Sequence, residues 1–250
     1  MNLRSDTLNS MSKINCQKEL VGNDVWVACS GGVDSIVVAH YIRCKLKRDV
    51  KLFHFNHALR SQNWEMEKAV KRFAEAFGMP IEIRRAIWDP TELVKTPREN
   101  ELRIKRLEAL VEVVQGSSVI YGHHLNDCVE SYLMNTFNGI GERIPIPIAT
   151  EIDGALVLRP FMLTPKKAFE RYADAYCLND FIVKDETNSD TKYRRNWVRN
   201  ELIPMVDQTY PGLEKVVFKK MVDYYHGLGD PRDNKTKAET IINWLKENEI

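Results

Sequence analysis

Short apolar runs alternate along the first 140 residues with longer segments whose apolar residues recur at helical spacing. The runs predict buried strands at 25–28, 50–56, 80–84 and 117–121. The intervening segments predict helices at 36–46, 63–77, 99–114 and 126–137. Strands that alternate with helices favour a parallel sheet covered on both faces. The sequence therefore predicts an α/β fold with a doubly wound, mainly parallel sheet and helices on both faces.

The pattern changes after residue 137. Residues 138–153 contain four Gly or Pro and predict a loop, followed by a short strand at 156–159 and a helix at 165–178. Further helices are predicted at 191–206 (interrupted around Pro204), 213–225 and 235–248. We therefore expect three parts: a flexible N-terminal arm (1–19), a main catalytic domain (20–206) and a small helical C-terminal extension (207–250).

One stretch joins the first predicted strand to its helix through a loop with two glycines, SGGVDS at residues 30–35. Backbone N–H groups at a helix start attract anions, and the hydroxyls of Ser30 and Ser35 can donate hydrogen bonds to phosphate oxygens. An acid in such a site, Asp34, is best explained as a Mg²⁺ ligand. The loop predicts a phosphate site; the alternatives are an ordinary Gly-Gly turn and an Asp34 that only caps the helix.

Two further polar clusters follow predicted strands, at residues 57–60 and 123–127. In open α/β sheets, ligands bind outside the carboxyl ends of the strands. Because all three clusters fall at such ends, we expect them to form one site.

The second of these clusters continues into a predicted helix. His124, Asp127 and Glu130 are spaced so that they can share one helix face. Asp127 could coordinate a metal ion or accept a proton from an attacking amine. The alternative is that these acids only complement the helix dipole.

Composition excludes several classes of protein. The 250 residues are 44% hydrophobic and 28% charged, with a net charge of +1, so no polyanionic partner is required by bulk charge. Five scattered cysteines without a C-x-x-C pair argue against a disulfide scaffold, a zinc site or an iron–sulfur site. The sequence has no long apolar run and no leader pattern, and we expect a cytoplasmic protein without a membrane contact.

The loop at 30–35 resembles the pyrophosphate-binding loop of PP-loop ATP pyrophosphatases. Four more stretches make residues 20–206 similar to the tRNA(Ile)-lysidine synthase family: HALR (57–60), GHHLNDCVES (122–131), LRPF (158–161) and DETNSDTKYRRNWVR (185–199). That family adenylates the C2 carbonyl oxygen of a wobble cytosine in tRNA, and lysine then displaces AMP. The resemblance implies ATP and Mg²⁺ as cofactors, and L-lysine and the anticodon arm of a tRNA as partners.

The resemblance also implies roles for individual residues. Those implied to bind ATP are Ser30, Gly31, Gly32, Val33, Asp34 and Ser35; those implied to act in catalysis are Asp34, Asp127 and Arg199, with Asp34 and Asp127 also holding the metal. Those implied to bind substrate are His57, Arg60, Glu101, His124, Glu130, Arg194, Arg195 and Asn196. In this interpretation Arg199 stabilises the adenylated intermediate and Glu101 meets the α-amino group of lysine. The alternatives are a solvated face for the arginines and an ordinary first-turn acid for Glu101.

The chain departs from the family pattern at three points. Asn126 replaces the first of two acids, Leu107 replaces a usual tyrosine, and the chain ends at Ile250, where the family usually continues into domains that grip tRNA. We therefore expect a short form. The alternatives are a PP-loop ligase or thiolase acting on another base or small substrate, and a catalytically impaired ATP- or tRNA-binding homologue. The tRNA identity and a homodimer remain open.

Overall fold

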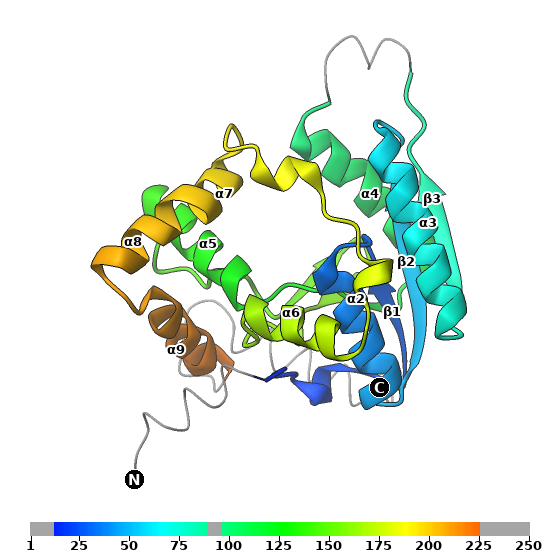
Figure 1. Ribbon diagram of the computed structural model, residues 1–250, viewed down its shortest axis with the longest axis horizontal. Helices are drawn as coiled ribbons and strands as arrows, with labels where there is room; N and C mark the ends of the chain where they lie inside the picture. The colour runs from blue at the N-terminus through cyan, green and yellow to red at the C-terminus, as the bar shows by residue number, and fades with distance from the viewer. Residues whose placement is uncertain (1–12, 90–96, 226–250) are drawn as a thin grey trace.

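A computed structural model describes residues 13–89 and 97–225 of the chain. Its centre is a six-stranded sheet in the order β3-β2-β1-β4-β6-β5 (Figure 1). The strands are β1 (Asp24–Ala28), β2 (Asp49–Asn56), β3 (Ile81–Arg85), β4 (Ser118–Ile120), β5 (Ala149–Ile152) and β6 (Ala155–Leu158). Neighbouring strands are parallel except for β5, which runs antiparallel to β6. The predicted mainly parallel sheet is therefore confirmed.

Helices cover both faces of this sheet. The helices are α2 (Val33–His40), α3 (Ser61–Ala76), α4 (Glu99–Val114), α5 (Leu125–Phe137), α6 (Lys166–Ala175), α7 (Arg194–Trp197), α8 (Ile203–Thr209) and α9 (Leu213–Tyr225). On one face, Leu52 packs in a cluster with residues of α2, α3 and α6. On the other face, the next residue, Phe53, packs with Leu110 and Val114 of α4. This alternation along β2 follows from the period of two of a strand and confirms the doubly wound arrangement.

The last helices form a second layer beside the sheet. Residues of α9, among them Val217 and Met221, pack against Leu125 and Val129 of α5 in a cluster of their own. In Figure 1, α7 and α8 lead into α9 on the side of the molecule where α5 lies. The expected helical region at the C-terminal end of the described chain is present.

Three elements differ from the sequence prediction. Residues 138–153 are not all loop, because β5 lies within them and pairs with β6 as a hairpin. The strand expected at 156–159 is the second half of that hairpin. The helix expected to break around Pro204 continues into α8, because Pro204 falls in the first turn of α8, directly after a π-helical turn at Val198–Leu202. The i→i−4 bonding is already interrupted there, so the missing N–H of proline costs little.

The described part of the expected N-terminal arm is attached to the body. Asn15 and Thr164 exchange two hydrogen bonds of 2.9 and 2.7 Å, and the Gln17 amide donates to the Pro160 carbonyl at 2.8 Å. Residues 1–12 and the helix expected at 235–248 lie outside the described residues. Among the described helices, none combines the length and apolar character that crossing a membrane requires.

Candidate active site

The glycine-rich loop between β1 and α2 is held by its own side chains. The Ser35 hydroxyl accepts from the Ser30 amide at 3.1 Å, donates to the Gly32 carbonyl at 3.0 Å and lies 3.2 Å from the Ser30 hydroxyl. Gly31 has a φ of +91°, and a Cβ there would lie 3.3 Å from Val70 Cγ2. A side chain at this position would be strained and crowded, so the loop needs glycine at Gly31.

The loop after β4 lies directly against this phosphate loop. A Cβ on Gly122 would approach the backbone carbon and oxygen of Asp34 to 3.3 Å. This close approach brings the start of α5 next to the start of α2. Two of the three predicted clusters are therefore neighbours, as expected from their positions at strand ends.

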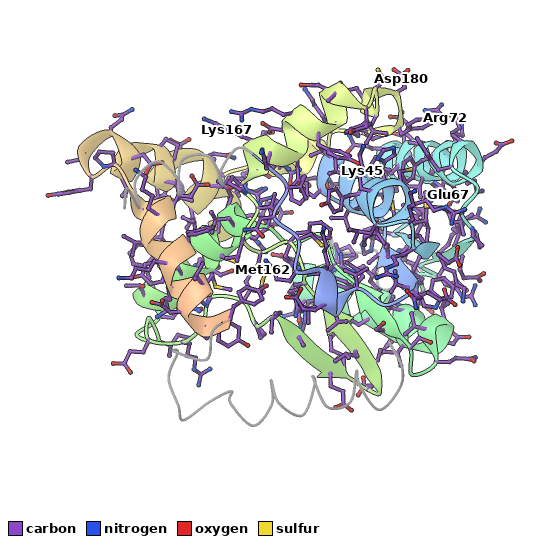
Figure 2. All side chains as sticks on the ribbon, turned by 90° about the horizontal axis from the view of Figure 1, so that it is seen from below. Lys45, Glu67, Arg72, Met162, Lys167 and Asp180 are labelled. Carbon is purple, nitrogen blue, oxygen red and sulfur yellow. The ribbon has the colours of Figure 1, made fainter. Side chains whose placement is uncertain are left out.

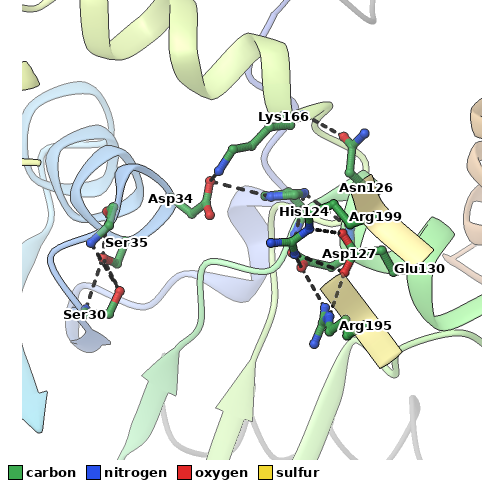
Figure 3. A network of polar contacts seen from close by, with 11 residues as sticks. Ser30, Asp34, Ser35, His124, Asn126, Asp127, Glu130, Lys166, Arg195 and Arg199 are labelled. Atoms are coloured by element: carbon green, nitrogen blue, oxygen red, sulfur yellow. Dashed lines mark hydrogen bonds and ion pairs between the residues drawn. The ribbon is translucent and has the colours of Figure 1, made fainter. Parts of the chain in front are cut away.

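Asp34 is the acid of the phosphate loop and has two cationic or polar neighbours (Figure 3). Its Oδ1 lies 2.5 Å from Lys166 Nζ and 3.6 Å from His124 Nε2. Burial favours the neutral acid, but the hydrogen bond and charge of His124 and the charge of Lys166 outweigh it and lower the pKa of Asp34 to about 2. Asp34 is therefore a carboxylate at neutral pH.

His124 links this acid to the next one. It is the N-cap of α5: its amide donates to Asp127 Oδ2 at 3.0 Å, and its Nδ1 accepts from the Asp127 amide at 3.4 Å. The other ring nitrogen, Nε2, faces Asp34 Oδ1 at 3.6 Å. The predicted substrate residue His124 thus lies buried between the two acids predicted to hold a metal.

Two buried acids of α5 and two half-buried arginines from the α7 region form an ion network, which we call the helix-pair network: Asp127, Glu130, Arg195 and Arg199 (Figure 3). Arg195 donates to Asp127 Oδ1 and to Glu130 Oε2, both at 2.7 Å. Arg199 donates to both oxygens of Glu130 at 2.6 and 3.0 Å. The predicted shared face of α5 is confirmed, and the pairs fasten α7 and the following π-helical turn to α5.

Two neighbouring histidines and Arg195 set the charge state of Asp127. Burial favours the neutral acid, but His124, His123 and Arg195 outweigh it and lower the pKa of Asp127. A carboxylate held ionised in this way is a weak proton acceptor and a good partner for a cation.

Asp34 and Asp127 could hold a Mg²⁺ ion if the phosphate oxygens of a substrate and water supply its other ligands. Within residues 13–89 and 97–225, no three His, Cys, Asp or Glu side chains are arranged to hold a metal ion. Mg²⁺ is usually held by one or two carboxylates, with phosphate oxygens and water completing its octahedron. Two carboxylates bridged by His124 beside a phosphate loop match that donor set.

The remaining predicted site residues lie outside this network. Arg60 and Arg194 are exposed. Asn196 donates to the carbonyls of Thr187 and Asp190 at 2.7 and 3.0 Å, and so holds the turn that precedes α7. Asn196 therefore has a positioning contact of its own.

Glu101 and His57 also have structural partners. The carboxylate of Glu101 accepts from the Arg98 amide at 2.8 Å, and this bond caps the start of α4. The same carboxylate pairs with the Arg98 guanidinium. The His57 carbonyl accepts from Trp88 Nε1 at 2.7 Å. Burial, together with the charge of Arg106, lowers the pKa of the His57 imidazole to about 4. His57 is thus neutral at physiological pH.

Several site residues were missed from the sequence. The sequence predicts Lys166 only as part of a helix start after Pro165. In the structure, the Asn126 side chain accepts from the Lys166 amide at 2.8 Å, and the Lys166 side chain reaches Asp34. His123 lies within the GHHLNDCVES stretch, but the sequence pattern assigns it no role. Burial, together with the charge of Arg159, lowers its pKa to about 4 although Asp127 opposes this, and its Nδ1 is buried without a hydrogen-bond partner.

A second buried ion cluster positions the loop after β2. Glu67 of α3 pairs with Arg85 at 2.7 Å and accepts from the Asn56 side chain at 2.8 Å. Asn56 in turn accepts from the Ala58 amide at 2.8 Å, where the backbone has a φ of +54°. No motif or periodicity signals Glu67, because its partners come from other strands.

Comparisons with known proteins agree with this geometry. The PP-loop domain family matches residues 6–206 of the chain. The chain is 28% identical over 196 residues to the tRNA(Ile)-lysidine synthase of Staphylococcus aureus, covering 75% of this chain and 45% of that protein. It is 29% identical over 202 residues to the synthase of Exiguobacterium sibiricum, covering 80% and 47%. It is 27% identical over 206 residues to that of Thermotoga maritima, covering 79% and 49%.

The chain spans about half the length of these curated relatives. Among solved structures, the U34-tRNA thiolase NcsA from Methanococcus maripaludis superimposes with a TM-score of 0.67 at 17% identity, covering 86% of this chain and 76% of that one. At that identity the likeness concerns the fold alone. The match over residues 6–206 shows that this chain belongs to the PP-loop domain family.

Proposed function

We propose that this protein joins lysine to C2 of a wobble cytidine in a tRNA, at the expense of ATP, through an adenylated cytidine. The observation that supports it most directly is the contact chain from the phosphate loop to α5: Asp34 to His124 to Asp127. This contact chain supports a phosphate site in the glycine-rich loop, next to the charged side chains of α5. The similarity to tRNA(Ile)-lysidine synthases supplies the substrate class.

In the first step, the C2 oxygen of the cytosine attacks the α-phosphorus of ATP, and pyrophosphate leaves. The loop from Ser30 to Ser35 would hold the phosphates through its backbone N–H groups. Asp34 and Asp127 would hold Mg²⁺, which when bound neutralises the pyrophosphate leaving group. Lys166, which lies 2.5 Å from Asp34, brings a second positive charge to the same place.

In the second step, a lysine amine attacks C2, and AMP leaves with the oxygen. The attacking ammonium must first lose a proton, which passes to solvent water. Of the two roles left open for Asp127, its lowered pKa and its bond to Arg195 favour holding a cation over accepting that proton. Arg195 and Arg199 are both engaged by Glu130, so we assign them to shaping the site around the intermediate.

The tRNA would be held by local contacts, because the net charge of the chain is only +1. Exposed Arg60 and Arg194 are available on the rim of the site. Each phosphate contact adds about one unit to the dependence of log K on log salt. We therefore propose salt-sensitive binding directed at the anticodon arm. An isolated anticodon stem-loop should then bind nearly as well as whole tRNA.

The deciding experiment incubates the protein with ATP, labelled lysine and total tRNA, followed by digestion and nucleoside analysis. The expected product is a cytidine that carries the labelled lysine, together with AMP and pyrophosphate in equal amounts. The matched control is Asp34→Asn, which should give none of the three. RNA-dependent pyrophosphate release without lysine incorporation would instead indicate a PP-loop enzyme with another nucleophile or another base.

A further inference from the structure

A cavity of about 380 Å³ is lined by residues of α6 and of the turn that contains Lys45, which is labelled in Figure 2. It opens between α6, the π-helical turn Tyr41–Lys45 and the segment at residues 13–14. We call it the tyrosine cavity and define it by six lining residues: Lys13, Tyr41, Lys45, Arg171, Tyr172 and Tyr176. Its volume lies within the range of small-ligand sites.

The tyrosine rings of the cavity are held in place. The rings of Tyr172 and Tyr176 lie 4.4 Å apart between centroids, and Tyr41 lies 5.8 Å from Tyr172. The Tyr172 hydroxyl is 2.9 Å from Nδ1 of buried His40. Tyr176 remains 40% exposed, and its ring becomes available to a ligand once the exposed Lys45 side chain moves aside.

The charges around these rings have one sign. Lys45 Nζ lies 4.2 Å from the centroid of the Tyr176 ring, and exposed Arg171 and Lys13 complete the lining. No carboxylate lines the cavity, and within the described ranges no ion pair within 4 Å joins these three cations to an acid. Aromatic faces beside uncompensated cations are the features that bind a base together with its phosphate.

We propose that the tyrosine cavity binds one nucleotide of the RNA substrate, with the base against Tyr176 and the phosphate on Lys45 and Arg171. This rests on the proposed function, which makes RNA the polymer at the site. The first residue of α6, Lys166, contacts Asp34. Tyr176 follows ten residues later, about 15 Å along the helix axis. A nucleic-acid strand that advances about 3.4 Å per nucleotide covers that distance in about four to five nucleotides, so one RNA can reach both places.

The test measures binding of whole tRNA over a range of salt concentrations. The variants are Lys45→Ala combined with Arg171→Ala, and Tyr176→Ala; all three side chains are exposed, so folding is not at stake. The double variant should lower the slope of log K against log salt by about 0.7 to 0.9, because both cations are proposed to hold one phosphate. Tyr176→Ala should weaken binding about tenfold without changing the slope. Lys47→Ala removes an exposed lysine two residues from Lys45 and should change neither quantity.

ATP binding, measured by equilibrium dialysis, should be equal in all four proteins. If the wild type binds tRNA and the cavity variants bind it equally well, the cavity assignment is wrong and the proposed function stands. If the wild type binds no tRNA, the proposed function fails, and the assignment of the cavity to RNA fails with it. Binding of free AMP that is lost in Tyr176→Ala, with tRNA binding unchanged, would assign the cavity to a small nucleotide and overturn the proposal.

Discussion

The phosphate loop and the helix-pair network lie side by side but are built in different ways. The loop is held by contacts between Ser30 and Ser35, five residues apart. The network joins residues 65 to 69 positions apart, Glu130 to Arg195 and Arg199. A local loop can form before the domain is complete, whereas the network exists only once α5 and α7 have packed.

The acids of the two regions also differ in exposure. The side chain of Asp34 is 34% exposed and pairs with Lys166, whereas that of Glu130 is 1% exposed and pairs with two arginines. A ligand can reach the first acid but not the second. We therefore expect substitutions at Asp34 to act mainly on catalysis and substitutions at Glu130 mainly on stability.

The largest effect is expected from Asp34→Asn. The variant keeps the shape of the side chain but removes the charge that balances Lys166 and would hold the metal. ATP cleavage to AMP and pyrophosphate should fall about a thousandfold, measured by pyrophosphate release in the presence of tRNA. Asp24→Asn, an exposed acid paired with Lys51, is the control and should cleave ATP at the wild-type rate. Undiminished release in Asp34→Asn would exclude the metal role.

Glu130→Gln tests the helix-pair network and should lower the free energy of unfolding. It leaves two guanidinium groups facing a neutral amide, and breaking a buried ion pair is strongly destabilising. Because the arginine side chains are 37% exposed, water compensates in part, and we expect a loss of about 3 kcal/mol in the free energy of unfolding. Urea denaturation measures this, with the exposed acid Glu108→Gln as control. A variant as stable as the wild type would mean that solvent already neutralises these arginines.

The same contrast explains what the sequence could predict. The loop, the alternating strands and the shared face of α5 follow from local spacing, and the structure confirms them. Lys166 and the pairing of Arg195 with Glu130 depend on which helices pack together, and spacing along the chain does not encode that. The strand β5 was missed because its four residues sit among Gly and Pro, and only pairing with β6 makes them a strand.

Acidification should lower the stability of the protein through the neutral imidazole of His123 before it affects the acids of the ion network. The pKa of His123 is lowered to about 4 in the folded protein, against 6.5 when unfolded. The unfolded chain therefore takes up a proton first, and stability is full above pH 6.5 and falls as the pH drops toward 4. His123→Asn should remove about 2 kcal/mol of the loss between pH 7 and pH 5, measured by urea denaturation at each pH.

Asp127 provides the control for the change in stability between pH 7 and pH 5. Its pKa is lowered, so its contribution to stability is present above the pKa of about 3.9 of the unfolded chain and is lost only below that value. Asp127→Asn should therefore shift stability equally at pH 7 and pH 5. A wild-type stability that is flat between pH 7 and pH 5 would contradict the burial of a neutral His123.

The smallest effect is expected at Asn126, which stands where the similar family carries a second acid. Its Oδ1 accepts from the Lys166 amide at 2.8 Å, and Asn126→Asp keeps that acceptor while adding a negative charge at the start of α6. The charge complements the helix dipole and should stabilise the protein by about 0.5 kcal/mol. Asn126→Ala, which removes the acceptor, should destabilise it by about 1 kcal/mol.

Ligation by Asn126→Asp should stay within about threefold of the wild type, because the amide already positions Lys166 against Asp34. A gain of tenfold or more, measured as lysine incorporated into tRNA, would show that the missing carboxylate handicaps this chain.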